Sequence, residues 1–310
     1  MYDCLGLGII SLDYICLIDH YPAANSKNRF SRLVQQGGGP VPTALATLSK
    51  LGLSCALISK LGRDQQAEWL LAELDTWHIA SDYMLRTAAA TPFAIILCAQ
   101  DTATRTVFLH RRGDNNLSAE EVQHLLAVMT PARLLHLDGH ETEAALPAAR
   151  WAREKGITVS LDIGSPRFVP AELLRLVDIL IVSRDYLAPA GNDPDYPLLC
   201  QKLLKYGARL VGITCGEQGS YLATPHEVCY QPAFRVKVVD STGAGDVYHG
   251  AALFGWLNGF DLGDIARFAS ACAALKCRQA GGKTAIPALA QVRSFLSQRG
   301  EPCTFLHAIP

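Results

Sequence analysis

Helical and strand patterns alternate regularly in the second part of the sequence. Helical periodicity over residues 119–129 and 143–155 is followed each time by a short apolar run, at 134–137 and at 158–163. Further apolar runs of strand length follow at 179–182 and 210–214. Strands joined by helices of about ten to fifteen residues run parallel, because only such a crossover returns the chain to the same end of the sheet. The pattern therefore predicts an α/β protein with a mainly parallel central sheet.

The first third of the sequence differs, because several of its strands have no helix between them. Strand patterns occur at 4–10, 14–19 and 29–35, and a pair at 93–99 and 104–110 flanks a turn at 100–103. Helices at 43–51 and 65–77 enclose a short strand at 55–59. The segments from about 14–36 and 92–112 predict a small sheet that covers the carboxyl ends of the main strands as a lid. We expect one domain over 1–310, with the lid as its appendage.

The composition excludes several classes of protein. Hydrophobic residues make up 49% of the 310 residues, which is enough for a packed core and rules out a fully disordered chain. The net charge of −1 gives no support for a nucleic-acid or anionic-membrane surface. The N-terminus lacks the features of a signal peptide, and no apolar run approaches the roughly 18 residues that span a bilayer. The ten cysteines form neither a C-x-x-C pair nor a zinc-spaced cluster. We expect a cytoplasmic protein with reduced thiols.

The segment 235–253, RVKVVDSTGAGDVYHGAAL, carries the clearest chemical signal. Its alternating run with Val236 and Val238 predicts a strand, the small residues that follow predict a turn, and apolar periodicity after Asp246 predicts a helix. Small residues at a helix N-terminus let backbone N–H groups approach an anion, and the helix dipole favours negative charge there. We therefore expect an anion site at this turn, with Asp246 beside it.

Such an arrangement suits phosphoryl transfer. The N–H groups of Gly243, Ala244 and Gly245 would stabilise charge on the transferred phosphoryl group, and Asp246 would accept the proton of the attacking hydroxyl. From spacing alone, the alternative is a carboxylate that merely caps the helix. The segment is no P-loop, because no G-x-x-x-x-G-K-S/T string occurs. It is no Rossmann fingerprint either, because its glycines lack the G-x-G-x-x-G spacing.

The string DSTGAGDVYHGAAL at 240–253 resembles the C-terminal signature of the ribokinase-like (PfkB) family of carbohydrate kinases. GGGPVPTALATLSKLG at 37–52 resembles the N-terminal signature of that family, and shorter matches at 59–64, 214–222 and 281–287 come in the family's order. The resemblance implies a three-layer α/β/α domain with a small β-sheet lid. It also implies an ATP-dependent kinase that phosphorylates a hydroxyl of a small carbohydrate.

The resemblance assigns roles to residues around the acceptor. Asp246 matches the general base, and residues 243–245 match the anion hole. Asp13 matches an aspartate that binds sugar hydroxyls, a task that suits a carboxylate because it accepts two hydrogen bonds. Gly38 and Gly39 match the glycines that let a sugar lie against the backbone.

Other matches concern the nucleotide and its ions. Thr214, Gly216 and Gly219 match the loop around the nucleotide phosphates and ribose. Gly282 lies in the stretch that passes near adenine and a monovalent-cation site. The resemblance therefore implies ATP as phosphoryl donor and Mg²⁺, and it raises a monovalent cation such as K⁺ as a third cofactor.

The chain departs from the family pattern at two places. Many relatives have an asparagine shortly after the glycine pair, where this chain has PVPT at 40–43, so the acceptor must be held differently. The N-x-x-E string that helps to organise magnesium is replaced by VSRDYLAPAG at 182–191, which offers Ser183, Asp185 and Tyr186. The protein ligands of the metal are therefore unknown.

Two subgroups of the family share these departures. Ketohexokinases look similar around 103–110 and 182–187, and bacterial sulfofructose kinases look similar around 37–44, 231–251 and 268–287. The second resemblance is the longer, and it favours a ketose or its derivative as the acceptor, phosphorylated at its C1 hydroxyl.

The second resemblance raises the question of an anionic tail on the acceptor. Such a tail would need cationic partners, and Lys27 on the lid is a candidate. Gly139 and His140 stand where an arginine for a sulfonate would be sought, so a neutral sugar stays open. His110, at the end of the second lid hairpin, is a further candidate for contact with the acceptor.

The sequence also predicts where four other polar residues near these segments lie. Asp138 and Asp162 end strands of the main sheet, where residues tend to face the ligand crevice, so both are candidates for the site. Arg105 is expected on the surface of the lid, and His249 is expected to pack rather than to catalyse.

Two alternative functions stay open. A nucleoside kinase would need an apolar and aromatic slot for the base, and a non-catalytic sugar or nucleotide sensor on the same fold would not need Asp246. In either case the partners are small molecules. Because open sheet edges tend to pair, we also expect a homodimer through the lid.

Overall fold

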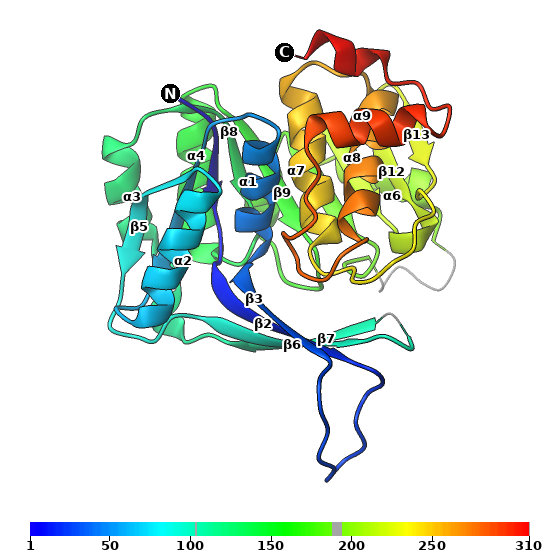
Figure 1. Cartoon of the computed structure of the whole chain (residues 1–310). Helices are drawn as coiled ribbons and strands as arrows, with labels where there is room; N and C mark the ends of the chain where they lie inside the picture. The colour runs from blue at the N-terminus through cyan, green and yellow to red at the C-terminus, as the bar shows by residue number, and fades with distance from the viewer. Residues whose placement is uncertain (103, 188–193, 310) are drawn as a thin grey trace.

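The computed structural model describes residues 1–102, 104–187 and 194–309, and it contains a large sheet between helices and a small second sheet (Figure 1). The strands of the large sheet are β1 (Tyr2–Leu7), β4 (Cys55–Leu61), β5 (Ile79–Arg86), β8 (Ala132–Leu137), β9 (Thr158–Ile163), β10 (Ile179–Ser183), β11 (Leu210–Thr214), β12 (Ser220–Ala223) and β13 (Val228–Gln231). Their order is β13-β12-β11-β10-β9-β8-β1-β4-β5. Neighbours from β11 to β5 are parallel, and β12 and β13 add an antiparallel edge. The predicted, mainly parallel central sheet is confirmed.

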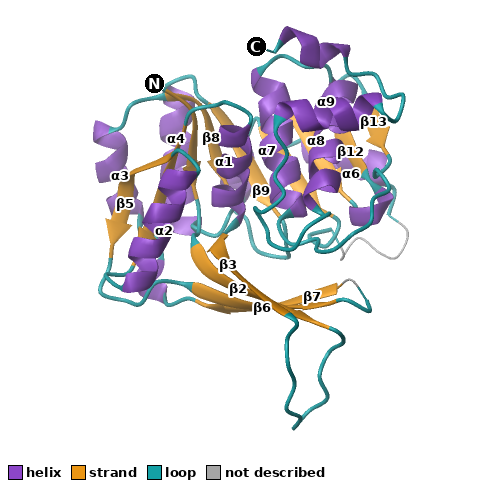
Figure 2. Cartoon of the chain, in the orientation of Figure 1, coloured by secondary structure: helices purple, strands orange, loops and turns teal. Residues whose placement is uncertain are grey.

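Helices cover both faces of the large sheet, because successive residues of each strand point to opposite sides. Cys4 and Leu134 belong to one buried cluster, and their neighbours Leu5 and Leu135 belong to another. The first cluster joins the sheet to α1 (Pro40–Lys50), α2 (Gln65–Thr76), α7 (Ala244–Leu257), α8 (Leu262–Lys276) and α9 (Leu289–Ser297). The second joins it to α3 (Ala119–Val128), α4 (Thr142–Glu154), α5 (Ala171–Leu174) and α6 (Tyr196–Leu204). The three-layer α/β/α architecture is thereby confirmed (Figure 2).

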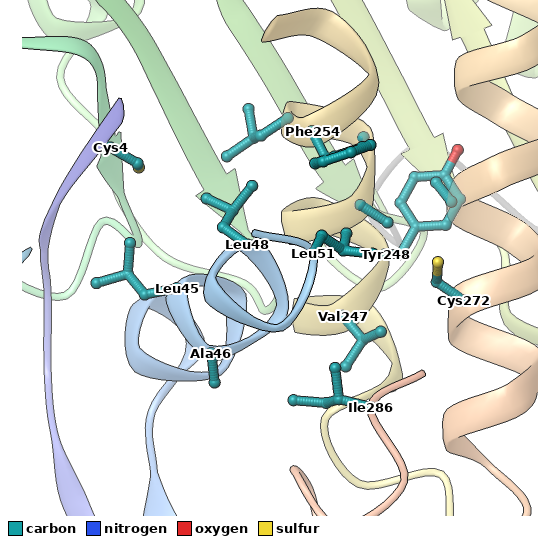
Figure 3. Close-up of a cluster of buried hydrophobic side chains, with 14 of the residues drawn as sticks. Cys4, Leu45, Ala46, Leu48, Leu51, Val247, Tyr248, Phe254, Cys272 and Ile286 are labelled. Atoms are coloured by element: carbon teal, nitrogen blue, oxygen red, sulfur yellow. The ribbon is translucent and has the colours of Figure 1, made fainter. Parts of the chain in front are cut away.

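Helix α7 lies at the centre of the first cluster, against α1 and α8 (Figure 3). Its side chains Val247 and Phe254 belong to the same buried cluster as Leu45 and Leu48 of α1. The two helices approach closely at Gly250, where an added Cβ would lie 2.6 Å from the carbonyl oxygen of Ala44. The position of the N-terminus of α7 is therefore fixed by dense packing on more than one side.

The small sheet has the strand order β3-β2-β6-β7, with β2 (Ser11–Ile18), β3 (Arg32–Gly38), β6 (Phe93–Ala99) and β7 (Thr104–His110). Strands β2 and β6 are parallel, and the two outer pairs are antiparallel. One face is closed by a buried cluster of Ile15, Leu17, Ala94, Ile96 and Cys98 with Ala280 from the body. The sheet lies at one end of the large sheet, and the loop between β2 and β3 extends away from the body (Figure 1).

The strand order of the large sheet reverses at β1, which lies between β4 on one side and β8 on the other. Ligands of open α/β sheets bind outside the carboxyl ends of the strands at such a point. Here the N–H of Ile9, just after β1, donates to Asp138 Oδ2, just after β8, at 3.0 Å. The small sheet starts at the same place, since β2 follows Ile9 almost directly.

The structure differs from the sequence prediction at several elements. The strand predicted at 4–10 is divided between β1 and β2, and α1 begins at Pro40 because a proline is tolerated in the first helical turn. Strands β5, β12 and β13 add to those that the patterns predict. The strand predicted around Val236 and Val238 is wrong, because residues 232–239 have no regular structure. There the N–H of Val239 donates to the carbonyl of Cys277 at the end of α8, at 2.8 Å.

Other expectations concern the cysteines and membrane spans. Each of the ten cysteines has a free thiol, and several, such as Cys98, are buried. Within residues 1–102, 104–187 and 194–309, no helix combines the length and the apolar character that crossing a bilayer requires. Residue 103 of the predicted lid turn and residues 188–191 of the VSRDYLAPAG string lie outside the described residues.

Candidate active site

The glycine-rich turn begins α7 with an unusual backbone conformation. Gly243 is the N-cap residue and has a φ of 75°, in the left-handed region that favours glycine. A Cβ at this position would lie 2.7 Å from the carbonyl oxygen of Gly282. Both the conformation and the space therefore require glycine, and Asp246 is held in the first turn of the helix.

The backbone N–H groups of the turn do not all stay free. The N–H of Ala244 donates to the carbonyl of Ser241 at 3.1 Å, so it closes the turn. Among the hydrogen bonds of the described residues, none uses the N–H of Gly243, Gly245 or Asp246. The N–H groups available to an anion are therefore those of Gly243, Gly245 and Asp246, which differ from the predicted set by one residue.

Asp240 ties this turn to the loop that follows α8. Its Oδ1 accepts the N–H of Thr242 at 2.8 Å, and its Oδ2 accepts the N–H of Gly281 at 2.8 Å. The predicted residue Gly282 follows directly and lies against both Gly243 and the side chain of Gln36. The structure thus brings the turn, the loop 281–282 and strand β3 together.

The carboxylate of Asp246 lies in an environment that favours its neutral form more than water does. Burial raises its pKa to about 6, and the negative charge of Asp138 acts in the same direction. The positive charges of Arg105 and Lys276 oppose this rise. A carboxylate with this pKa is largely ionised at neutral pH and is a better proton acceptor than an exposed one.

Asp13 lies in β2, is buried, and accepts the hydroxyl of Ser11 at Oδ1 over 2.7 Å. Burial raises the pKa of Asp13 to about 6, and the charge of Asp246 contributes to the rise. The two predicted carboxylates therefore lie within electrostatic reach of each other. The predicted glycines adjoin them: an added Cβ would lie 1.9 Å from Asp13 Oδ2 at Gly38, and 2.1 Å from the carbonyl oxygen of Ile9 at Gly39.

A buried ion pair supports the backbone of this glycine segment. The Lys283 ammonium contacts Glu73 Oε2 of α2 at 2.6 Å, and Glu73 Oε1 accepts the N–H of Gly37 at 3.0 Å. Lys283 also holds the pKa of Asp13 lower than burial alone would. Sequence patterns did not predict this pair, because its partners are 210 residues apart.

Asp138 and Asp162 both lie at the carboxyl edge of the sheet, as expected. Burial raises the pKa of Asp138 to about 6. Burial and the charges of Asp246 and Asp138 raise the pKa of Asp162 well above its usual range. His249 Nε2 lies 3.3 Å from Asp162 Oδ1, and burial lowers the pKa of this imidazole. Both shifts oppose the charged form of the side chain, and His249 packs one turn beyond Asp246.

Arg105 is exposed on the small sheet, as expected, and it also reaches the body. It lies in β7 and its Nη1 donates to Ser241 Oγ of the glycine-rich turn at 3.3 Å. Its side chain remains exposed. The residue therefore joins the site through a contact between two sheets, which no local pattern reveals.

The predicted nucleotide loop lies at the ends of β10 and β11. Gly219 accepts the N–H of Cys215 at 2.8 Å and donates to Gly216 at 3.1 Å, so the chain turns tightly after Thr214. A Cβ on Gly219 would lie 2.1 Å from the carbonyl oxygen of Gln231. The neighbouring Arg184 donates through Nη1 to the Cys215 carbonyl at 3.2 Å.

Two residues predicted to contact the acceptor have no hydrogen bond or ion pair to these groups within the described residues. Lys27 is exposed in the loop between β2 and β3, and no hydrogen bond or ion pair of the described residues joins it to the site. His110 ends β7, is exposed, and packs against Phe93 with ring centroids 5.0 Å apart.

Near Gly139, Arg167 fills the space that the missing side chain leaves: its Cδ would lie 3.6 Å from an added Cβ.

Metal-binding side chains are not grouped in the described part of the chain, where no set of three or more His, Cys, Asp or Glu residues has a suitable arrangement. Ser183 donates to the carbonyl of Gly164 at 3.0 Å, and Asp185 lies at the surface beside Arg184. The residues of the replaced N-x-x-E string that are described therefore make structural contacts.

The chain is similar to known proteins of one family. The model of the family described as pfkB family carbohydrate kinase matches residues 3–289. The chain is 28% identical to the ATP-dependent ribose-1-phosphate kinase of Halopiger xanaduensis over 305 residues, which covers 96% of this chain and 99% of that protein. It is 28% identical to the nucleoside kinase of Methanothermobacter thermautotrophicus, over 96% of this chain and 97% of that one. It is 24% identical to the ketohexokinase of Mus musculus, over 88% of this chain and 95% of that one.

The fold agrees with this similarity. The structure of a putative ribokinase II of E. coli, in complex with ATP and Mg²⁺, superposes with a TM-score of 0.81 at 19% identity, over 96% of this chain and all of that one. The family match spans most of the chain, and the predicted resemblance is confirmed. The chain belongs to the pfkB family of carbohydrate kinases, and it is a phosphotransferase.

Proposed function

We propose that this protein is an ATP-dependent sugar kinase in which Asp246 is the general base. The observation that supports the proposal best is the position of Asp246 in the first turn of α7, beside N–H groups that no described residue uses. The negative charge of Asp246 contributes to the raised pKa of Asp13, the proposed ligand of sugar hydroxyls. A proton acceptor, an anion site and an acceptor-binding carboxylate thus meet where α/β sheets bind ligands.

The reaction follows from these positions. The carboxylate of Asp246 takes the proton of the acceptor hydroxyl as the hydroxyl oxygen bonds to the γ-phosphorus. The bond between that phosphorus and the bridging oxygen breaks, and ADP leaves with the electron pair. The N–H groups of Gly243, Gly245 and Asp246 stabilise the negative charge on the transferred group. Asp13 orients the acceptor by accepting hydrogen bonds from its hydroxyls.

The cofactors of the proposal are supported to different degrees. ATP fits the free N–H groups and the tight turn after Thr214, and Mg²⁺, held mainly by the phosphates, would neutralise their charge. The structure of a related fold contains both ligands. For a monovalent cation, the support is the sequence resemblance alone.

The acceptor that we propose is a ketose or its derivative, phosphorylated at a primary hydroxyl. The similarity to a ketohexokinase supports it, together with the matching strings at 103–110 and 182–187. An ADP-release assay over aldoses, ketoses, sugar acids, sulfosugars and nucleosides tests the proposal. Turnover is expected to be fastest with a ketose, and faster turnover of an aldose or a sugar acid than of every ketose would contradict this choice.

A nucleoside acceptor is the second candidate, and a relative named as a nucleoside kinase favours it. The same screen decides, because adenosine and inosine are among its substrates. A non-catalytic sensor is the third reading. Binding of ATP and a sugar without any ADP formation would support it and would contradict the kinase.

The small sheet is proposed to act as a lid and as the contact of a homodimer. Arg105 of β7 already reaches the glycine-rich turn, which supports closure over the site. Several apolar side chains of this sheet are exposed: Leu33, Ile95, Val107, Phe108 and Leu109. Because an exposed edge strand with apolar side chains tends to pair, a second copy of the chain is a suitable cover.

A further inference from the structure

A lysine is completely buried directly behind the glycine-rich turn. Lys276 is the last residue of α8 and has no exposed surface. Its ammonium donates to the main-chain carbonyl of Asp240 at 2.9 Å. The helix C-terminus favours a positive charge at this position, but burial of an ammonium is costly unless its charge is used.

The charge of Lys276 is not cancelled by a carboxylate in contact with it. Among the described residues, no carboxylate lies within ion-pair distance of this ammonium. The other buried lysine of the region, Lys283, differs in this respect because it contacts Glu73 at 2.6 Å. Among the described residues, Lys276 therefore contacts a main-chain carbonyl and no carboxylate, whereas Lys283 forms an ion pair with Glu73.

Lys276 holds the residue on which the shape of the turn depends. Its acceptor, Asp240, receives the N–H groups of Thr242 and Gly281 at its carboxylate and so fixes both ends of the site's backbone. The residue after α8, Cys277, accepts the N–H of Val239 at its carbonyl at 2.8 Å. The end of α8 thus determines where the chain enters the turn.

Several charged groups surround this ammonium. Burial lowers its pKa, Asp240 and Asp246 oppose this, and Arg105 acts with burial. The thiol of Cys277 is a further neighbour. In return, Lys276 holds the pKa of Asp246 lower than burial alone would, so its charge is felt at the proposed base.

We propose that Lys276 is a positioning residue whose ammonium serves as a built-in cation: it fixes Asp240 and supplies a positive charge beneath the N–H groups of the turn. The inference rests on the proposed function, because it takes this turn to be the anion site. One consequence is that turnover requires no dissolved monovalent cation, in contrast to the expectation raised by the sequence resemblance.

The experiment compares the wild-type chain with Lys276→Met, which keeps the volume, and with Lys276→Ala, which leaves room for a small ion. Lys202→Met is the matched control, because Lys202 also lies in the last turn of a helix but is exposed. The rate of ADP formation is measured in KCl, NH₄Cl and tetramethylammonium chloride at equal ionic strength. Melting temperatures report whether each variant folds.

The wild type and Lys202→Met should work equally well in all three salts. Lys276→Met should lose about tenfold or more in kcat, with a smaller change in the KM of the acceptor, because the turn is needed mainly in the transition state. In Lys276→Ala, NH₄⁺ or K⁺ should restore part of the lost kcat, whereas tetramethylammonium, which is too large, should not.

Three results would overturn the inference while leaving the proposed function intact: wild-type turnover that depends on K⁺, a folded Lys276→Met with wild-type kcat, or a Lys276→Ala that no cation restores. Absence of ADP formation by the wild type with every acceptor would contradict the proposed function itself, and this inference with it.

Discussion

Gly38 leaves no room for a side chain against Asp13, since an added Cβ would lie 1.9 Å from the carboxylate oxygen Oδ2. The two residues belong to neighbouring strands of the small sheet, β3 and β2, near the point where both strands join the body. The glycine therefore allows the backbone of β3 and a buried carboxylate to occupy the same corner of the site.

Gly38→Ala should move the carboxylate of Asp13 or the backbone beside it. The expected result is an increase of about tenfold or more in the KM of the acceptor, because a displaced carboxylate no longer meets the sugar hydroxyls. Gly113→Ala is the control, because nothing lies within 4 Å of an added Cβ there. An acceptor KM that is unchanged in a folded Gly38→Ala would contradict the role of this corner.

Gly250→Ala should destabilise the fold by about 1–3 kcal/mol, because its methyl group would press on the carbonyl of Ala44 where α7 meets α1. Gly263→Ala in the first turn of α8 is the matched helical control, with Asp261 Oδ1 at a comfortable 3.6 Å from an added Cβ. Urea unfolding measures both. Equal stability of the two variants would show that α7 and α1 separate easily.

The activity should fall as the pH is lowered through about 6, since Asp246 and Asp13 both have a pKa of about 6 and both act as carboxylates. Protonation removes the proposed base Asp246 and the proposed sugar-binding carboxylate of Asp13 together. The fall of activity on the acid side of the pH profile should therefore be steeper than one proton allows. The pH profile of kcat/KM measures this. A profile that stays flat to about pH 4 would exclude raised pKa values at these residues.

Ile95→Lys should convert the proposed homodimer into a monomer. Ile95 lies opposite Phe108 in the small sheet, and both side chains are exposed in the single chain. A charge placed on such a contact resists burial. Val128→Lys, on the exposed end of α3, is the control. Light scattering measures the mass, and a wild-type monomer at working concentration would contradict the dimer.

Much of the fold could be predicted because its signals are local. The helix–strand alternation after residue 118 specifies parallel strands, and the small residues before Asp246 specify a helix start. The strand predicted at Val236 failed for a tertiary reason: alternating valines favour a strand, but here the N–H of Val239 donates to the carbonyl of Cys277, the residue after α8. Within the described part of the chain, no strand pairs with residues 232–239.

From the residues themselves, without the family resemblance, the candidate site could be predicted only where one segment carries it. Asp246 and its glycines are consecutive, so the sequence shows them together. Arg105 and the pair of Lys283 with Glu73 reach the site from distant segments, and nothing in their own neighbourhoods marks them. Lys276 did leave a signal, because it is a single lysine inside the apolar run ACAALKC at 271–277, and a charged side chain in such a run is unusual.

The central claim is that Asp246 takes a proton during phosphoryl transfer, and Asp246→Asn tests it most directly. Its matched control is Asp264→Asn, because Asp264 also lies in the first helical turn, of α8, but far from any proposed chemistry. Single-turnover formation of ADP with the best acceptor should fall by about 10²- to 10⁴-fold in Asp246→Asn, with the melting temperature nearly unchanged, and should stay at the wild-type rate in Asp264→Asn. If both variants keep the wild-type rate, Asp246 only caps a helix and the account is contradicted.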